Sequence, residues 1–179
     1  TPEVQFLRNF RDSLVLSTRA GSAFMKVFNM WYYSFSPQVA DFIASHDSIR
    51  SPVRIGLYPL IGVLELSSAT YSALAFSSEF AVIVAGMLAS ALIGLIYLTP
   101  IVLFLIPLRK RNSGVTPRKA CAVSCLAALA LVVLGELTGS LGLLAVATSA
   151  LVLTTVVSAP LLSSFALERI WILLDHRER

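Results

Sequence analysis

Charged residues are scarce in this chain, and long stretches of its second half have none. Only 13% of its 179 residues are charged, against about 25% in an average soluble domain. No charged residue occurs in residues 80–108, 120–134 or 138–167. These runs are close to or above the roughly 20 residues that cross the hydrocarbon core of a bilayer. Because backbone groups in lipid must be satisfied within the segment, the runs predict membrane-spanning helices and argue against a soluble globular protein.

Residue types that build metal and catalytic sites are also few. The two histidines, His46 and His176, are far apart in the chain. The two cysteines, Cys121 and Cys125, lie one helical turn apart in an apolar run, which is typical of small core side chains. No nucleophile–base pair, phosphate-binding glycine loop or metal-ligand spacing is visible. The sequence therefore predicts no catalytic residue, no cofactor, no metal, no small-molecule substrate and no enzymatic activity of its own.

The net charge of +4 comes from basic residues that collect at the borders of the apolar runs. They do not form a groove-sized surface, so we do not expect nucleic-acid binding. By the positive-inside rule, the loop of residues 109–119 faces the cytoplasm, together with the C-terminus of a multi-pass cell-membrane protein. The basic cluster of this loop consists of Arg109, Lys110, Arg111, Arg118 and Lys119.

The pattern predicts an all-α, polytopic helical membrane protein with three to four transmembrane helices, preceded by short amphipathic helices. Residues 1–50 form the amphipathic or interfacial region, and residues 51–179 form the transmembrane domain. Gly139 and Ser140 turn the chain between the last two helices, and Pro160 is expected to kink the last one. The predicted transmembrane helices span residues 53–76, 79–108, 117–137 and 141–174, and the first of these is alternatively re-entrant or interfacial.

Prolines and a glycine mark the expected helix boundaries of the first half. Pro2, Pro37 and Pro52 each follow Ser or Thr, a pair that is typical of an N-cap and the first helical position. Gly21 is expected to break the chain between the first helix and a second one over residues 22–33. The third helix is then expected to begin at Pro37 and to end near His46.

The second of these helices is apolar nearly all round, with aromatic rings gathered at its end. Amphipathic rings of this kind are typical of a membrane interface or a protein contact. The alternative is a plain core helix of a small soluble bundle. The residues concerned are Phe24, Phe28, Trp31, Tyr32 and Tyr33.

Two further features concern the apolar helices. Gly86, Ser90 and Gly94 recur every four residues, which predicts a face on which another helix packs closely. Glu65 is the acidic residue deep in residues 53–76, and an intramembrane carboxylate is a functional-site hypothesis by default. The alternative for Glu65 is an ordinary contact with the Ser/Thr-rich helix or with headgroups.

Short motifs in residues 1–50 recur in a recognisable order. They are Pro2-Glu3-Val4, Leu7-Arg8-Asn9-Phe10-Arg11-Asp12, Gly21 followed by Phe24, Tyr32-Tyr33, and Ser36-Pro37 followed by Ala40-Asp41-Phe42-Ile43-Ala44. This order resembles the CFI-box domain, a C-terminal sorting or membrane-attachment module of archaeal and bacterial surface-associated proteins. Residues 29–35 are most similar to versions from ammonia-oxidising archaea and their relatives. The defining Cys-Phe-Ile-Ala-Thr-Ala box would lie just before Thr1 and is not in this chain. The resemblance implies a location and an anchoring role, without a reaction.

Three functions are compatible with these observations. The first is a membrane anchor or scaffold whose partners are the lipid bilayer and other membrane protein subunits. The second is an accessory subunit of a larger membrane enzyme, such as an archaeal ammonia monooxygenase or a respiratory complex, with the metals on other chains. The third is a small transporter or channel, based on Glu65, Glu136 and Glu168 near apolar segments. Four crossings would put residues 1–50 inside the cell, and three would put them outside.

Overall fold

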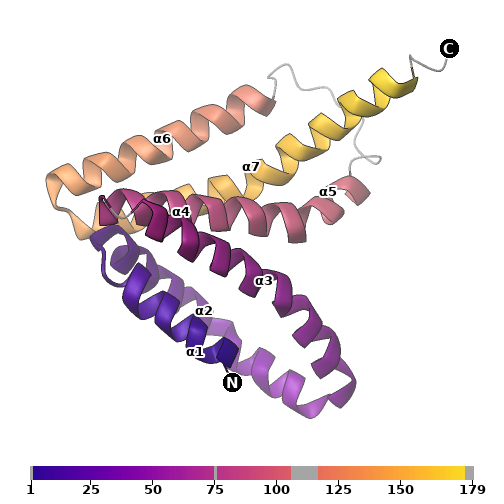
Figure 1. Cartoon of the computed structure of the whole chain (residues 1–179), viewed down its shortest axis with the longest axis horizontal. Coiled ribbons are helices and arrows are strands. Elements are labelled where there is room, and N and C mark those ends of the chain that lie inside the picture. Colours follow the sequence, from indigo (N-terminus) through magenta and orange to yellow (C-terminus); the bar gives the residue numbers. More distant parts are fainter. Residues whose placement is uncertain (1, 75, 106–116, 176–179) are drawn as a thin grey trace.

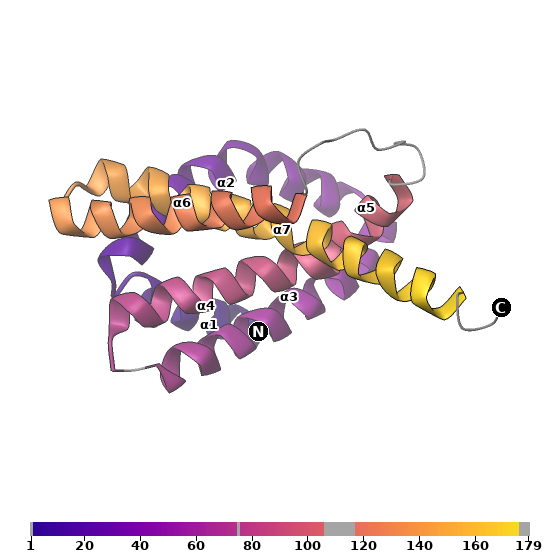
Figure 2. The same cartoon turned by 90° about the horizontal axis from the view of Figure 1, so that it is seen from above.

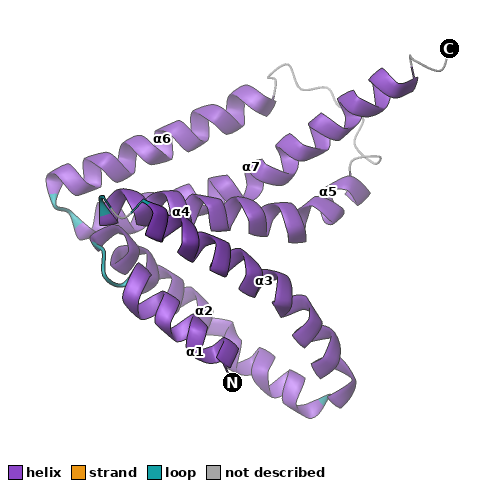
Figure 3. Cartoon of the chain, viewed as in Figure 1, coloured by secondary structure: helices purple, strands orange, loops and turns teal. Residues whose placement is uncertain are grey.

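The computed structural model describes residues 2–74, 76–105 and 117–175, and within them the side chains of residues 5–74, 76–102 and 119–163. Every element in these ranges is a helix (Figure 3). The all-helical class predicted from the sequence is therefore confirmed for the described part of the chain. The elements are α1 (Pro2–Asn9), the π-helical η1 (Phe10–Val15), α2 (Arg19–Ser45), α3 (Asp47–Ala73), α4 (Ser78–Ile93), the π-helical η2 (Gly94–Leu98), α5 (Thr99–Leu105), α6 (Pro117–Thr138) and α7 (Leu141–Asp175).

Three helical stretches are long and apolar enough to cross a membrane. They are Ser78–Val102, Lys119–Thr138 and Leu141–Ser163, with mean hydropathies of 2.4, 2.3 and 2.1. The first joins α4, η2 and the start of α5 into one rod. The predicted helix over residues 53–76 overlaps α3, which begins earlier, at Asp47, ends earlier, at Ala73, and is not among the three stretches found in the described residues.

The stretch in α7 packs against the other two, and together they form what we call the bundle, made of α4, η2, α5, α6 and α7. The two preceding helices, α2 and α3, form an antiparallel hairpin that we call the arm (Figure 1). The arm packs on the bundle with α2 against α7 and α3 against α4. The turn at His46 lies farther from the bundle, toward the end of the molecule where α5 ends and α6 begins (Figures 1 and 2).

The core joins the arm to the bundle through small side chains. Alanines dominate it, and Leu144 and Ala147 of α7 have no exposed surface. Lipid tails are as apolar as the core, so helices in a membrane gain little from burying large side chains and more from close backbone approach. The buried cluster contains Ala20 and Ala23 of α2, Ala128 and Val132 of α6, and Leu144, Ala147 and Leu151 of α7.

The predicted breaks at Ser36-Pro37 and Ser51-Pro52 are wrong. Pro37 lies inside α2, which runs without interruption from Arg19 to Ser45, and Pro52 and Pro59 lie inside α3. The predicted helices over residues 22–33 and 37–46 are therefore one helix. An internal proline removes one backbone hydrogen bond, but packing of the rest of the helix can outweigh that loss.

The break before α2 lies three residues earlier than Gly21. Thr18 is the N-cap, and its hydroxyl accepts a hydrogen bond from the Gly21 N–H at 3.1 Å. Gly21 belongs to the first turn of α2, where a Cβ would overlap the Val15 carbonyl oxygen. The glycine is therefore explained by a close approach of two chain segments and not by a break.

The hairpin between α6 and α7 agrees closely with the prediction. Gly139 has a φ of +66°, a conformation that favours glycine, and it forms the turn between these two helices. A Cβ on Gly135 would lie 3.1 Å from the Cα of Leu144, so the helices touch through their backbones just before the turn. Pro160 lies inside α7, which changes direction along its length (Figure 1).

Candidate functional site at the arm and its junction with the bundle

The N-terminus of α2 is held by a carboxylate from the bundle. The Glu79 Oε1 atom accepts a hydrogen bond from the Arg19 N–H at 2.7 Å, and its Oε2 atom accepts one from the Ala20 N–H at 3.2 Å. These amides belong to the first turn of α2, where no intrahelical partner exists and where the helix dipole favours negative charge. Glu79 itself lies in the first turn of α4. One side chain therefore fixes the start of the arm to the start of a predicted membrane span.

A second carboxylate from the bundle meets the same end of the arm. The Arg19 guanidinium lies 3.6 Å from the Glu136 carboxylate of α6, with side chains 50% and 25% exposed. The other oxygen of Glu136, Oε1, is buried and has no hydrogen-bond partner among the described residues. An exposed arginine limits the strength of this ion pair, because water screens it. We call the group formed by Thr18, Arg19, Glu79 and Glu136 the junction.

The junction is suited to positioning the arm. Its carboxylates already accept hydrogen bonds or face a guanidinium, and its only hydroxyl caps α2. Among the described residues, no group of three or more His, Cys, Asp or Glu side chains could hold a metal ion. What the arrangement does is set the angle at which the arm leaves the bundle.

Within the bundle, η2 lies in close contact with α7 at Gly94. A Cβ on Gly94 would overlap the Val156 carbonyl oxygen and lie 3.1 Å from the Val156 Cα atom. Residue 160 is a proline, so it has no N–H to donate to that carbonyl four residues earlier. The glycine of η2 therefore packs on a backbone oxygen that lacks its usual donor four residues later.

The three residues of the predicted packing face have different surroundings. Ser90 and Gly94 are buried, and the Ser90 hydroxyl donates to the Gly86 carbonyl at 2.6 Å. Gly86 is half-buried, and a Cβ there would have nothing within 4 Å. The structure therefore uses Gly94 for a contact inside the chain and leaves the Gly86 position open.

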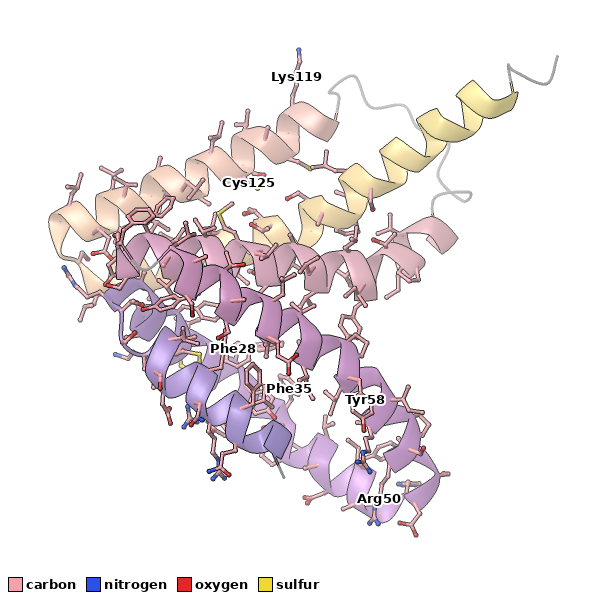
Figure 4. All side chains as sticks on the ribbon, viewed as in Figure 1. Phe28, Phe35, Arg50, Tyr58, Lys119 and Cys125 are labelled. Carbon is pink, nitrogen blue, oxygen red and sulfur yellow. The ribbon has the colours of Figure 1, made fainter. Side chains whose placement is uncertain are left out.

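Hydroxyl and thiol groups link the bundle helices on either side of this contact. The Thr99 and Ser163 hydroxyls are 3.4 Å apart, and the Cys125 sulfur lies 3.5 Å from the Ser158 hydroxyl (Figure 4 labels Cys125 between α6 and α7). Interhelical bonds of this kind stabilise helix pairs in a membrane by about 0.6 kcal/mol each. We interpret the two cysteines as packing residues of α6.

The predicted interface residues form a continuous aromatic ladder along α2. Phe28 contacts Phe24, Trp31 and Tyr32, with ring centroids 5.7, 6.0 and 5.8 Å apart. Trp31 is 61% exposed and Tyr33 is 63% exposed, whereas Phe24 and Phe28 are half-buried. The ladder continues to Phe35, which Figure 4 labels farther along the arm, with centroids 4.8 Å from those of Trp31. The aromatic side chains thus lie on the arm and remain largely uncovered.

Glu65 and the basic cluster do not join the junction. Glu65 is exposed on α3 and makes no ion pair or hydrogen bond with a described residue. Lys119 is exposed at the start of α6 and points away from the bundle (Figure 4). The other basic residues of the cluster, and Glu168, lie where the structure describes no side chain. They are Arg109, Lys110, Arg111 and Arg118.

Two exposed ion pairs, one in η1 and one at the turn of the arm, join residues that are close in the sequence. Arg11 of η1 donates to Asp12 at 2.7 Å, and this hydrogen bond lowers the pKa of the Asp12 carboxyl and raises the pKa of the Arg11 guanidinium. At the turn of the arm, Arg50 pairs with Asp47 at 2.8 Å and donates to the Ala44 carbonyl at 2.7 Å. Both pairs are exposed, so they are worth little to stability.

The residues of the junction were not identified from the sequence as one site. Glu136 was considered only as a possible transport carboxylate, and Arg19 and Glu79 were not assigned a role. An acidic residue in the first turn of a long apolar helix is a signal that could have found Glu79. Which amides it binds depends on contacts across about 60 residues of chain, and no local pattern encodes them.

Comparison of the chain with protein-family models, with curated proteins and with solved structures found no match. The function is therefore argued from the geometry of the arm, the junction and the bundle.

Proposed function

We propose that this chain is a non-catalytic membrane scaffold, held in the bilayer by its three apolar helical stretches, whose arm binds a helix of another membrane subunit. Insertion is supported by the length and apolarity of Ser78–Val102, Lys119–Thr138 and Leu141–Ser163. Because α2 packs on α7 and α3 on α4, and the arm extends between the same two ends of the molecule as the bundle, insertion of the bundle places the arm at the depth of the bilayer as well (Figure 2).

Unpartnered polar side chains on the arm carry the proposal. Gln38, Asp41 and Glu65 are exposed, and none of them makes a hydrogen bond or ion pair with a described residue. At bilayer depth such groups are costly unless they face protein or water. A partner helix that hydrogen-bonds to them would remove that cost, whereas lipid tails would not.

The surroundings of these polar groups fit a helix partner. Gln38, Asp41 and Phe42 are spaced three and four residues apart, which puts them on one face of α2. Phe42 is 54% exposed, and Ile55 on the neighbouring helix is 65% exposed. A mixed face with a few polar groups among large apolar ones is typical of helix–helix interfaces in membranes.

The resemblance of residues 1–50 to a membrane-attachment module supports the same role. The module implies an anchoring function at the membrane, and the arm and the junction both include residues from this region. The scaffold proposal does not depend on which protein the partner is. If the partner carries catalytic metals, the chain is an accessory subunit of that enzyme.

Purification in gentle detergent, followed by mass spectrometry of the co-purifying chains, tests the proposal. We expect a membrane protein in fixed stoichiometry, and we expect Asp41→Ala and Phe42→Ala to reduce its recovery. Val123→Ala is the matched control, because Val123 is 64% exposed on α6, away from the arm. A chain that purifies alone, or a partner retained equally by all these variants, would contradict the proposal.

A further inference from the structure

An apolar groove lies between α2 and the beginning of α7. Its volume is about 360 Å³, within the range of small-ligand sites, and it is open along one side. It lies near the Arg19 end of the arm, where α7 begins directly after the Gly139 turn. It is lined mainly by Ser22, Lys26, Val27 and Met30 of α2 and by Leu141 and Gly142 of α7.

A single cation lies in the lining of this groove. Lys26 is exposed and makes no hydrogen bond or ion pair with any described residue. It is the only charged residue that lines the groove. Carboxylates near this end of the arm are engaged elsewhere, since Glu79 accepts from the amides of α2 and Glu136 faces Arg19. The Lys26 charge is thus available to an anion.

The position of the groove matches the depth of lipid headgroups. Leu141 is the first residue of the span Leu141–Ser163, so the groove begins where that span meets the membrane border. The first amides of α7, on Leu141 and Gly142, have no intrahelical acceptor and add positive potential there. A Cβ on Gly142 would have nothing within 4 Å, so the missing side chain leaves open space on the α7 side of the groove.

We infer that this groove binds one anionic membrane phospholipid, with a hydrocarbon chain against Val27, Met30 and Gly142 and the phosphate at Lys26. The inference rests on the proposed membrane insertion but not on the proposed partner subunit. An apolar groove with one cation in its lining complements a lipid with a negative headgroup. A second protein helix has no need of that charge.

The test uses the full chain in nanodiscs that contain phosphatidylglycerol and phosphatidylcholine, followed by release into detergent and native mass spectrometry. We expect one retained phosphatidylglycerol per chain. Lys26→Gln should weaken retention about fivefold, the effect of one lysine near an anionic surface. Gly142→Leu should abolish retention, because a large side chain would occupy the groove.

Two matched variants and one separate measurement make the outcome decisive. Lys119→Gln removes an exposed lysine outside the groove, and Gly62→Leu adds a side chain where a Cβ would meet nothing within 4 Å. Both should retain the lipid. Carbonate extraction of each variant tests insertion, so loss of lipid from a fully inserted chain cannot be confused with failure to insert. The inference would be overturned if Gly142→Leu retained as much lipid as the unmodified chain, or if the chain showed no preference for the anionic lipid. It would also be overturned if a co-purified protein, and not a lipid, occupied the groove.

Discussion

Gly94 is a residue at which the contact between two bundle helices depends directly on a missing side chain. The backbone of α7 at Val156 fills the position of its Cβ, and backbone atoms cannot move aside as the end of a flexible side chain can. We expect Gly94→Ala to lower stability by about 1–3 kcal/mol, as overpacking does, despite the better helix propensity of alanine. Thermal unfolding in mild detergent measures this effect.

Gly86→Ala is the control for that substitution, since it makes the same chemical change where a Cβ meets nothing within 4 Å. It should leave the unfolding temperature unchanged or slightly raised, because alanine is the better helix former. Equal losses at both positions would show that helix composition, and not the contact with Val156, sets the stability.

Glu79 joins the arm to the bundle through two backbone amides of α2. Glu79→Ala leaves both amides without an acceptor, and loss of a capping side chain typically costs about 1–2 kcal/mol. We expect a lower unfolding temperature in detergent and faster protease cleavage within the residues that precede α2. Glu65→Ala, which removes an exposed carboxylate without a partner in the described residues, should change neither quantity. A junction that tolerates Glu79→Ala as well as this control would contradict the role of Glu79.

At the scale of elements, α2 shows how far sequence reasoning reached and where it failed. Its helical character and its exposed aromatic residues were predicted, but its length was not. Ser36-Pro37 has the composition of a helix start, and the pattern cannot show that helix continues through the proline. The hairpin of α6 and α7 was predicted nearly to the residue, because its turn needs a residue with a positive φ and Gly139 supplies it. Local chemistry thus predicted the turn, whereas tertiary packing decided the continuity of α2.

Pro37→Ala tests whether α2 is a single helix. In a continuous helix the new N–H at position 37 can donate to the Tyr33 carbonyl, which raises stability by up to about 3 kcal/mol. A proline at the first position of a separate helix would have no such bond to restore, so its replacement would give no gain. Thermal unfolding separates the two cases, and circular dichroism checks that helix content is maintained.

At the scale of the whole molecule, the arm runs obliquely to the bundle and diverges from it toward the turn between α2 and α3 (Figure 1). The His46 turn lies at the same end as the start of α6, and the Gly139 turn lies at the opposite end (Figures 1 and 2). In a Cys121→Ala/Cys125→Ala background, we expect cysteines placed at Ser48 and Lys119 to react with a membrane-impermeant maleimide from one side. A cysteine at Ser140 should react from the other side. If the cysteine at position 48 reacted from the same side of the membrane as the cysteine at position 140, the arm would lie wholly outside the bilayer.

Insertion through the three apolar stretches is the claim on which the scaffold and lipid inferences both rest. Alkaline carbonate extraction of native membranes tests it most directly, because it strips peripheral proteins and leaves proteins that span the bilayer. The length and hydropathy of Ser78–Val102, Lys119–Thr138 and Leu141–Ser163 predict that the chain stays in the membrane pellet. Release of the chain into the soluble fraction would contradict the account.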